Sequence, residues 1–342
     1  MKNYRQELAT TLSALLGVQN VVLFSSCRNA VYSLLSSLNL SAEDEVIIQS
    51  FICDSLPLAI KKAGTKPIFV DVNEKTFNLE AQEVEKKITS KTKAIIFVHT
   101  YGNPSGILEI KKLCQKHNLI LIEDLAHALG ASYDMQLAGT FGDYTVYSFT
   151  KQMVNFGGGA VLSNHNLAAV IKIRDSFNQH ASLLTYIQRL LTSLYETRAF
   201  FLSKLLINLA PKKKKLGMVQ ELDAHFSCST IEAYLALKQL PNFIKLINKR
   251  KENYLFLQQN FLQQKKIKMQ TINEKSNSSF NYLSFIFLDK EKRDIAIKNN
   301  FLFSRPWSGS NISDTIAFVP NSPYSSRRVR QIWSFFRRKT GW

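Results

Sequence analysis

Short apolar runs alternate with amphipathic segments from about residue 20 to residue 163, a pattern typical of βα units. Seven runs are candidate strands: Val21–Phe24, Val46–Ile48, Pro67–Val70, Ala94–His99, Leu119–Ile122, Tyr144–Phe149 and Ala160–Leu162. Four segments between them fit helices: Arg28–Leu38, Pro57–Ala63, Glu80–Ile88 and Ile107–His117. The pattern predicts an α/β fold in which helices cover a mainly parallel seven-stranded sheet, with a binding site at the carboxyl ends of its strands.

The second half of the chain has a different pattern. It is strongly helical and amphipathic over 167–216, and a second helical block covers Ile231–Gln259. A mixed region follows, in which NYLSFIFL predicts a strand and SSRRVRQIWSFFRRK a final helix. We expect a large domain over 1–240, with a helical insertion at about 180–222, and a small α+β domain over 241–342.

The charge of the chain is strongly positive. Lys and Arg outnumber Asp and Glu by 44 to 26, which gives a formal charge of +18. Part of the excess lies in a lysine run at 212–215 and in the basic tail 327–339. A lysine-rich solvated surface and an affinity for anionic partners both remain open. No nucleic-acid recognition motif accompanies the clusters, so nucleic acid is not expected as a partner.

The amphipathic stretch 183–216 ends in the lysine run, as do some helices that dock on membranes. Packing in a dimer interface or on the protein's own domain is the more common use of such a face. The N-terminal segment fits an amphipathic helix rather than a secretory signal. The four cysteines are scattered, without metal-ligand spacing, so we expect no disulfides, no metal site and a cytoplasmic location.

The segment NLILIEDLAHALGA (118–131) is the first that indicates chemistry. Its apolar strand ends in Glu123 and Asp124, and the pattern predicts that an Ala-rich helix with His127 follows. A carboxylate at the carboxyl end of such a strand can hold a protonated heteroaromatic nitrogen. An ordinary N-cap aspartate is the alternative.

The second such segment is FGDYTVYSFTKQMVNFGGGAVLSN (141–164). A predicted strand containing Ser148 runs straight into Lys151, and Gly157–Gly159 lead into the next strand. A lysine placed there can form an imine with an aldehyde cofactor, whereas a lone lysine is usually a solvated turn residue. The presence of Asp124 and His127 favours the first interpretation.

The third segment is FSSCRNAVYSLLSSL (24–38), where small polar residues separate a strand from a helix. Backbone N–H groups at a helix N-terminus suit a phosphate. Ser25, Ser26 and Asn29 could add hydrogen bonds there, and Arg28 could add charge. Ser and Asn are also ordinary helix caps.

In this order and spacing, the three segments resemble the DegT/DnrJ/StrS family of sugar aminotransferases, a branch of the fold-type-I pyridoxal-phosphate enzymes. DEVII (44–48), AGTKPIFVDVNEKTFNLE (63–80) and TSKTKAIIFVHTYGNPSG (89–106) extend the resemblance, as does STIEAYLALKQLPNFIKLINKRKENY (229–254). The resemblance implies that Lys151 carries pyridoxal 5'-phosphate as a Schiff base and shuttles a proton. Asp124 would keep the ring nitrogen protonated, and His127 would lie near the ring hydroxyl.

The same resemblance implies further cofactor contacts. Cys27, Arg28 and Asn29 match the phosphate-binding turn, and Ser148 is a further phosphate contact. Cys53 falls where many members stack an aromatic ring on the cofactor. His225 aligns with an asparagine that reaches the cofactor phosphate of the neighbouring subunit.

The implied reaction moves an amino group from an amino acid, expected to be glutamate, to a keto carbon of a nucleotide-linked sugar for surface polysaccharide or glycoconjugate synthesis. Lysine at 151 favours transamination over dehydration, because dehydrating relatives have histidine there. The resemblance also implies a homodimer with shared active sites.

Departures from the family pattern keep alternatives open. Only two residues separate Ser148 from Lys151, where members usually have four, and Arg28 replaces a small hydroxyl residue. A non-catalytic or regulatory member is therefore the main alternative. The second alternative is another fold-type-I activity, such as that of a lyase or a desulfurase. A desulfurase would need Cys228 as a mobile nucleophile.

Overall fold

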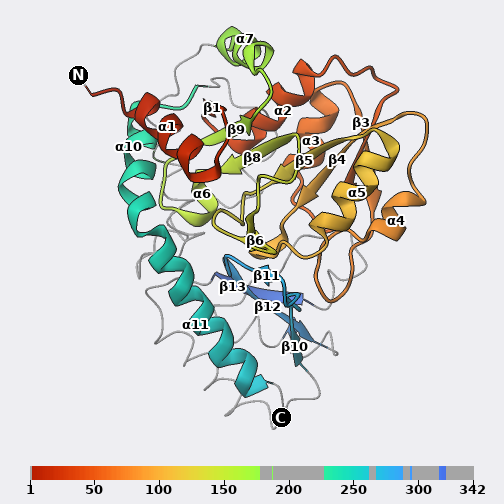
Figure 1. The fold of residues 1–342 in the computed structure, drawn as a ribbon, viewed down its shortest axis with the longest axis vertical. Helices are drawn as coiled ribbons and strands as arrows, with labels where there is room; N and C mark the ends of the chain where they lie inside the picture. Colours follow the sequence, from red (N-terminus) through yellow and green to blue (C-terminus); the bar gives the residue numbers. More distant parts are fainter. Residues whose placement is uncertain are drawn as a thin grey trace.

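The computed structural model describes residues 2–177, 187, 227–261, 267–287, 293–294 and 316–320. Its main feature is a seven-stranded sheet (Figure 1). In spatial order the strands are β1 (Asn20–Phe24), β9 (Gly159–Ser163), β8 (Tyr144–Ser148), β5 (Ile120–Asp124), β4 (Thr92–Val98), β2 (Glu45–Gln49) and β3 (Lys66–Val70). Only β9 runs antiparallel to its neighbours in this sheet. All seven predicted strands, and the mainly parallel sheet, are confirmed.

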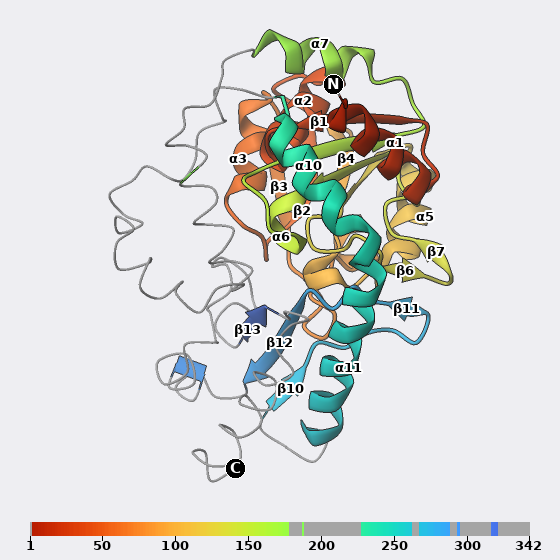
Figure 2. The same ribbon diagram turned by 90° about the vertical axis from the view of Figure 1, so that its left-hand side faces the viewer.

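Helices cover both faces of this sheet (Figure 2). One face packs against α2 (Cys27–Ser37), α3 (Ser55–Lys62) and α7 (Ala168–Ser176). The other packs against α1 (Tyr4–Leu16), α4 (Ala81–Glu85), α5 (Ile107–His117) and α10 (Thr230–Gln239). Alternate residues of β2 enter the two cores, with Val46 and Ile48 on one side and Ile47 on the other. Burial on both faces explains why the strands appear in the sequence as unbroken apolar runs.

The predicted helices agree with the structure, except that the predicted helix Glu80–Ile88 is longer than the observed one. The helix α4 ends at Glu85 because Lys87 N and Ile88 N bond three residues back, to Val84 O and Glu85 O, which tightens the last turn.

The C-terminal part has its own sheet. It contains β10 (Ile267–Met269), β12 (Tyr282–Phe287) and β13 (Ile316–Pro320), all antiparallel. The helix α11 (Phe243–Phe261) follows α10 through the 3₁₀ turn η2 (Leu240–Asn242). A small sheet of β11 (Ser276–Asn277), β6 (Ser132–Tyr133) and β7 (Gln136–Leu137) joins this part to the first.

The predicted strand at NYLSFIFL and the helical block Ile231–Gln259 are therefore confirmed. The predicted boundary at residue 240 falls at η2, and the division into two domains stays a prediction. The predicted final helix and most of the amphipathic stretch 167–216 lie outside the described residues.

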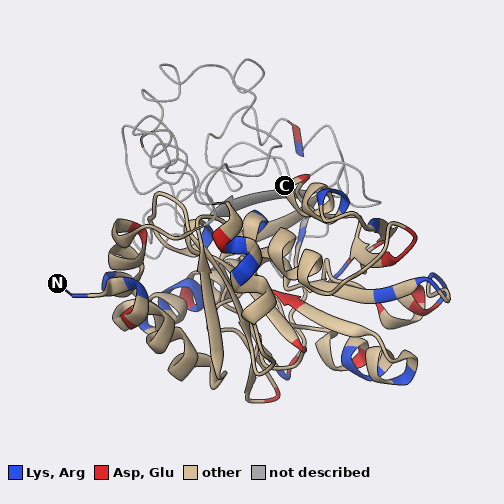
Figure 3. Cartoon of the chain, turned by 90° about the horizontal axis from the view of Figure 1, so that it is seen from above, with Lys and Arg blue, Asp and Glu red and all other residues tan. Residues whose placement is uncertain are grey.

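Charged residues of the described part lie mostly on helices and loops, while the central strands carry few (Figure 3). The lysine run at 212–215 and the basic tail 327–339 lie outside the described residues. None of the helices in the described part of the chain is long and apolar enough to cross a membrane. The four cysteines are free thiols.

Candidate active site

The strand register brings the three predicted segments to one edge of the sheet. Asp124, the last residue of β5, pairs with Val98 of β4 and Val146 of β8. In the neighbouring strands, Gly159 pairs with both Ser148 of β8 and Phe24 of β1. The carboxyl ends of β1, β5 and β8 therefore meet at the same edge, as the sequence predicted.

Glycine lets β9 approach the start of α2. A Cβ at Gly159 would lie 2.5 Å from Cys27 N and 2.6 Å from the carbonyl carbon of Ser26, so any side chain would overlap backbone. Gly158 N donates to Ser25 O at 2.6 Å, which fastens the two segments together. The glycine-rich segment thus shapes the turn that precedes α2.

The predicted phosphate turn is well ordered by local bonds. Ser26 caps α2 by accepting from Asn29 N at 3.3 Å. The Asn29 side chain is fully buried and donates to Ser25 Oγ at 3.1 Å. Asn29 therefore supports the turn from inside, and the residues at its surface are Cys27 and Arg28, both partly exposed. An 11-residue helix begins there, so its first N–H groups and its dipole favour an anion.

Asp124 is 7% exposed, and burial raises the pKa of its carboxyl from 3.8 to about 6. The hydrogen bond from Ala126 N at 2.8 Å and the electrostatic interactions with His99 and Lys151 act in the opposite direction. The carboxylate is ionised at neutral pH, in surroundings that penalise its charge.

The predicted Ala-rich helix after Asp124 is wrong. Residues 126–130 form consecutive turns, in which Ala128 N donates to Leu125 O and Ala131 N donates to Ala128 O. Gly130 has a φ of +79°, which no helix residue adopts. Asp124 consequently caps a turn and not a helix.

His127 is 5% exposed within these turns. Burial lowers the pKa of its imidazole from 6.5 to about 3, and the charge of Lys151 lowers it further. The ring stacks on Tyr101, with centroids 5.9 Å apart, and meets the edge of Tyr282 at 5.0 Å. At physiological pH it is neutral, so it can share a hydrogen bond with a phenolic group without adding a charge.

Lys151 is partly exposed and lies in α6 (Phe149–Gln152), a single helical turn. The predicted strand Tyr144–Phe149 ends at Ser148, so the strand does not run straight into Lys151. The lysine's positive charge lowers the pKa values of Asp124, His127 and Cys27. These three residues come from two other segments, so the Lys151 amine lies within electrostatic range of both.

The remaining predicted residues differ in what the structure shows. Ser148 is buried, with its Oγ 3.2 Å from Thr150 Oγ1. Cys53 Sγ lies 3.1 Å from Ser55 Oγ, and Cys53 is among the groups that raise the pKa of Cys27. Burial is the main cause that raises the pKa of Cys27 far above its usual value, so it is a thiol at neutral pH. His225 lies outside the described residues.

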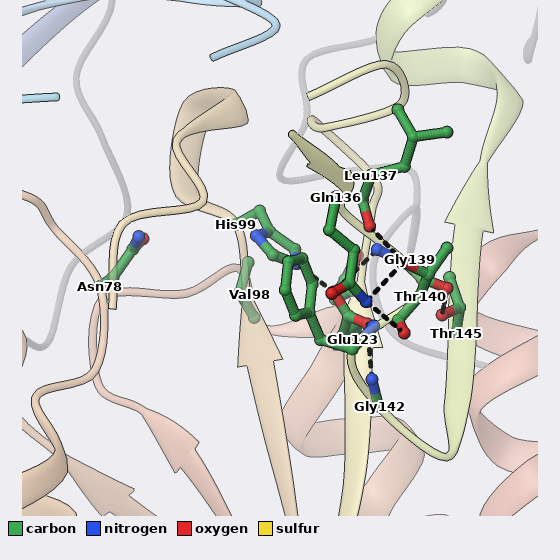
Figure 4. A network of polar contacts seen from close by, with 12 residues as sticks. Asn78, Val98, His99, Glu123, Gln136, Leu137, Gly139, Thr140, Gly142 and Thr145 are labelled. Carbon is green, nitrogen blue, oxygen red and sulfur yellow. Dashed lines mark hydrogen bonds and ion pairs between the residues drawn. The ribbon is translucent and has the colours of Figure 1, made fainter. Parts of the chain in front are cut away.

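A buried network beside Asp124 was not predicted (Figure 4). Glu123 is fully buried and accepts from Gly139 N at 2.7 Å, Phe141 N at 2.6 Å and Gly142 N at 2.8 Å. Its Oε2 also lies 2.9 Å from His99 Nε2. Glu123 thereby anchors the loop between β7 and β8 to the strand that carries Asp124. The only signal in the sequence was a second carboxylate at the end of an apolar strand.

Comparisons with known proteins agree with this arrangement. The model of the DegT/DnrJ/EryC1/StrS aminotransferase family matches residues 1–303. GDP-perosamine synthase of Escherichia coli O157:H7 is 37% identical over 164 residues, which cover 47% of this chain and 45% of the relative. UDP-N-acetyl-3-dehydro-alpha-D-glucosamine 3-aminotransferase of Acidithiobacillus ferrooxidans is 35% identical over 186 residues, covering 54% and 50%. The matched segments thus span about half the length of these curated relatives.

A solved structure extends the likeness of fold to almost the whole chain. The aminotransferase TlmJ of Streptoalloteichus hindustanus superposes with a TM-score of 0.78 at 20% identity, and the match covers 98% of this chain and 90% of that one. Together with the family match, this shows that the chain has the fold-type-I aminotransferase fold and belongs to the DegT/DnrJ/EryC1/StrS aminotransferase family.

Proposed function

We propose that the protein is an aminotransferase that uses pyridoxal 5'-phosphate and moves an amino group from an amino acid to a keto group of a nucleotide-linked sugar. The observation that carries the proposal is the meeting of Lys151, Asp124 and His127 at one edge of the sheet. These are an amine, an ionised carboxylate and a neutral imidazole, which suit the aldehyde, the protonated ring nitrogen and the ring hydroxyl of that cofactor.

The residues present also fit the cofactor phosphate. The N-terminus of α2 supplies N–H groups, Arg28 supplies charge, and Gly159 leaves the approach open. Asp124 provides the clearest sign of fit, because its buried carboxylate has an elevated pKa that a cationic ring nitrogen would bring down again. Bound there, pyridoxal phosphate would supply an aldehyde for the amine and an electron-accepting ring.

The chain's own residues have separate tasks in this proposal. Lys151 would hold the cofactor covalently and, when free, would move a proton at the reacting carbon. Asp124 would keep the ring nitrogen protonated, and His127 would orient the ring through its hydroxyl. Tyr101 and Tyr282 pack their rings against the imidazole of His127.

The substrate class rests on the relatives. The names of both curated relatives contain a nucleotide, and that of one specifies a 3-amino transfer to a dehydro sugar. Such substrates are polyanions, for which a chain of net charge +18 is electrostatically suited. Glutamate as amino donor, a role in surface polysaccharide synthesis, a small C-terminal domain after residue 240, a homodimer with shared sites and a cytoplasmic location complete the proposal.

A desulfurase is the less suitable alternative. Cys228 is 1% exposed immediately before α10, and burial raises the pKa of its thiol well above the usual value. A buried, protonated thiol lacks the exposure and the charge that a mobile nucleophile needs.

Absorption spectroscopy with added pyridoxal phosphate tests the proposal. Wild type and the control Lys62→Ala, which alters an exposed lysine of α3, should develop the visible band of lysine-bound cofactor, and Lys151→Ala should not. The band should bleach on addition of glutamate, and a keto sugar nucleotide should then yield an amino sugar by mass spectrometry. A folded wild type without the band would exclude the enzyme and favour a non-catalytic family member.

A further inference from the structure

The turn that carries Lys151 is too short to hold itself in place. The helix α6 has four residues, and a single helical turn lacks the internal hydrogen bonds that make a helix persist. Its direction therefore depends on contacts made by other parts of the chain. Asn281 Nδ2 donates to Lys151 O at 3.3 Å, and a shorter bond involves the side chain of the next residue, Gln152.

Gln152 clamps α6 to the turns that carry His127. Its Oε1 accepts from Leu129 N at 2.8 Å, and its Nε2 donates to Leu129 O at 3.5 Å. The side-chain amide thus engages both polar groups of one residue, as a neighbouring strand would. Gln152 is 4% exposed, so these bonds form where water does not compete.

The two bonds also connect the segment that carries Lys151 to the segment that carries His127. Successive residues of a helical turn point about 100° apart, so Gln152 can face the interior while Lys151 faces the site. Leu129 follows His127 by two residues, and Ser279 Oγ donates to His127 O at 2.6 Å from the other side. The clamp therefore fixes the lysine segment relative to the imidazole segment.

We propose that Gln152 is a positioning residue, whose amide sets the place of Lys151 against Asp124 and His127. The inference rests on the proposed function, since the proposed role of Lys151 defines what is being positioned. The short connection from Ser148 to Lys151 gives the clamp its importance, because two intervening residues leave little room for the lysine to adjust.

A glutamine of α10 that bonds to the segment following Lys151 offers a matched control. Gln239 of α10 clamps Val154 in the same way, with its Oε1 accepting from Val154 N at 2.9 Å and its Nε2 donating to Val154 O at 2.9 Å. Gln239→Met and Gln152→Met each remove such a pair of bonds at similar volume, and Gln239→Met also removes the bond from its Nε2 to Leu235 O at 2.8 Å within α10. Only the second change cuts the link to the His127 turns, so a purely structural role would make the two variants alike.

Two measurements test the proposal. Competitive acetylation of the cofactor-free protein, read by mass spectrometry, reports how fast the Lys151 amine reacts. We expect Gln152→Met to change that rate at least several-fold and Gln239→Met to leave it near wild type. With pyridoxal phosphate bound, single-turnover bleaching by glutamate should slow about tenfold or more in Gln152→Met, since a misplacement of about 1 Å can cost 10²-fold. The visible band and cofactor affinity should be retained.

Gln152→Glu gives a second variant if the methionine variant does not fold. It keeps the acceptor for Leu129 N and should restore part of the wild-type rate. Equal effects of Gln152→Met and Gln239→Met in both measurements would overturn the proposal. A wild type that binds no cofactor would overturn the proposed function alone, because the acetylation experiment would still decide the role of Gln152.

Discussion

The buried carboxylate of Asp124 should make the cofactor-free protein less stable at neutral pH than an otherwise identical protein without that charge. The pKa of the group is about 6 in the folded chain, against 3.8 for the ordinary carboxyl. A shift of about 2 units corresponds to about 3 kcal/mol, because each unit is worth 1.36 kcal/mol. Asp124→Asn removes this penalty and keeps the Oδ1 acceptor for Ala126 N.

The sign follows from the direction of the shift. Because the folded-state pKa is raised, the folded chain binds the proton more tightly, and ionisation favours unfolding. The penalty is absent below about pH 3.8, grows as pH rises and is complete above about pH 6. Relative to wild type, the free energy of unfolding of Asp124→Asn should therefore increase by about 2 kcal/mol between pH 4.5 and pH 8.

Urea unfolding of both proteins without cofactor, at several pH values, measures this increase. Any constant cost of the new amide group cancels, since only the change with pH matters. Asp54→Asn, at an exposed residue that makes no capping bond, is the matched control and should show no comparable increase. A difference between wild type and Asp124→Asn that stays constant over this range would refute the argument from burial. Saturating wild type with pyridoxal phosphate should reverse the order of stability, because the cofactor binds only the folded chain.

Three further predictions concern the same edge of the sheet. Glu123→Gln should lower the free energy of unfolding in urea by about 2–4 kcal/mol, because an amide cannot accept all the bonds of the buried carboxylate, whereas Glu85→Gln at an exposed ion pair should change it little. His127 should stay neutral from pH 5 to pH 8 by ¹⁵N NMR. Because the pKa of His127 is about 3 in the folded chain, protonation of the unfolded chain below pH 6.5 favours unfolding. By pH 5 this should cost wild type about 2 kcal/mol in free energy of unfolding, and His127→Gln should not show this loss. Gly159→Ala should cost about 1–3 kcal/mol and weaken cofactor binding in a spectral titration, because the new methyl overlaps Cys27 N; unchanged binding would argue against α2 as the phosphate site.

The sheet could be predicted from the sequence because its strands are buried on both faces. Ile47 in one core and Ile48 in the other leave a continuous apolar run that needs no knowledge of distant residues. The approximate site could be predicted for a similar reason, since carboxyl ends of parallel strands converge whatever the loops do.

The turns after Asp124 could not be predicted in the same way. Their Ala-rich sequence has high helix propensity, and only tertiary contacts overrule it. Leu129 N bonds to the Gln152 side chain, 23 residues later, and Gly130 adopts a left-handed conformation against Ile247 and Phe243 of α11. The partner of Glu123, His99, is likewise 24 residues away. A local sequence pattern does not indicate which distant residues will bond to one another.

Adjacent carboxylates at the end of β5 show why Asp124, and not Glu123, is suited to a ligand. Neighbouring residues of a strand point to opposite faces, so the two groups have separate surroundings although both are buried. Glu123 accepts three backbone N–H groups and pairs with His99, which together compensate its charge inside the protein. Asp124 accepts from Ala126 N, and its raised pKa shows that this bond and the nearby charges do not offset burial. A cationic ring nitrogen would therefore gain more at Asp124 than at any carboxylate that the fold has already satisfied.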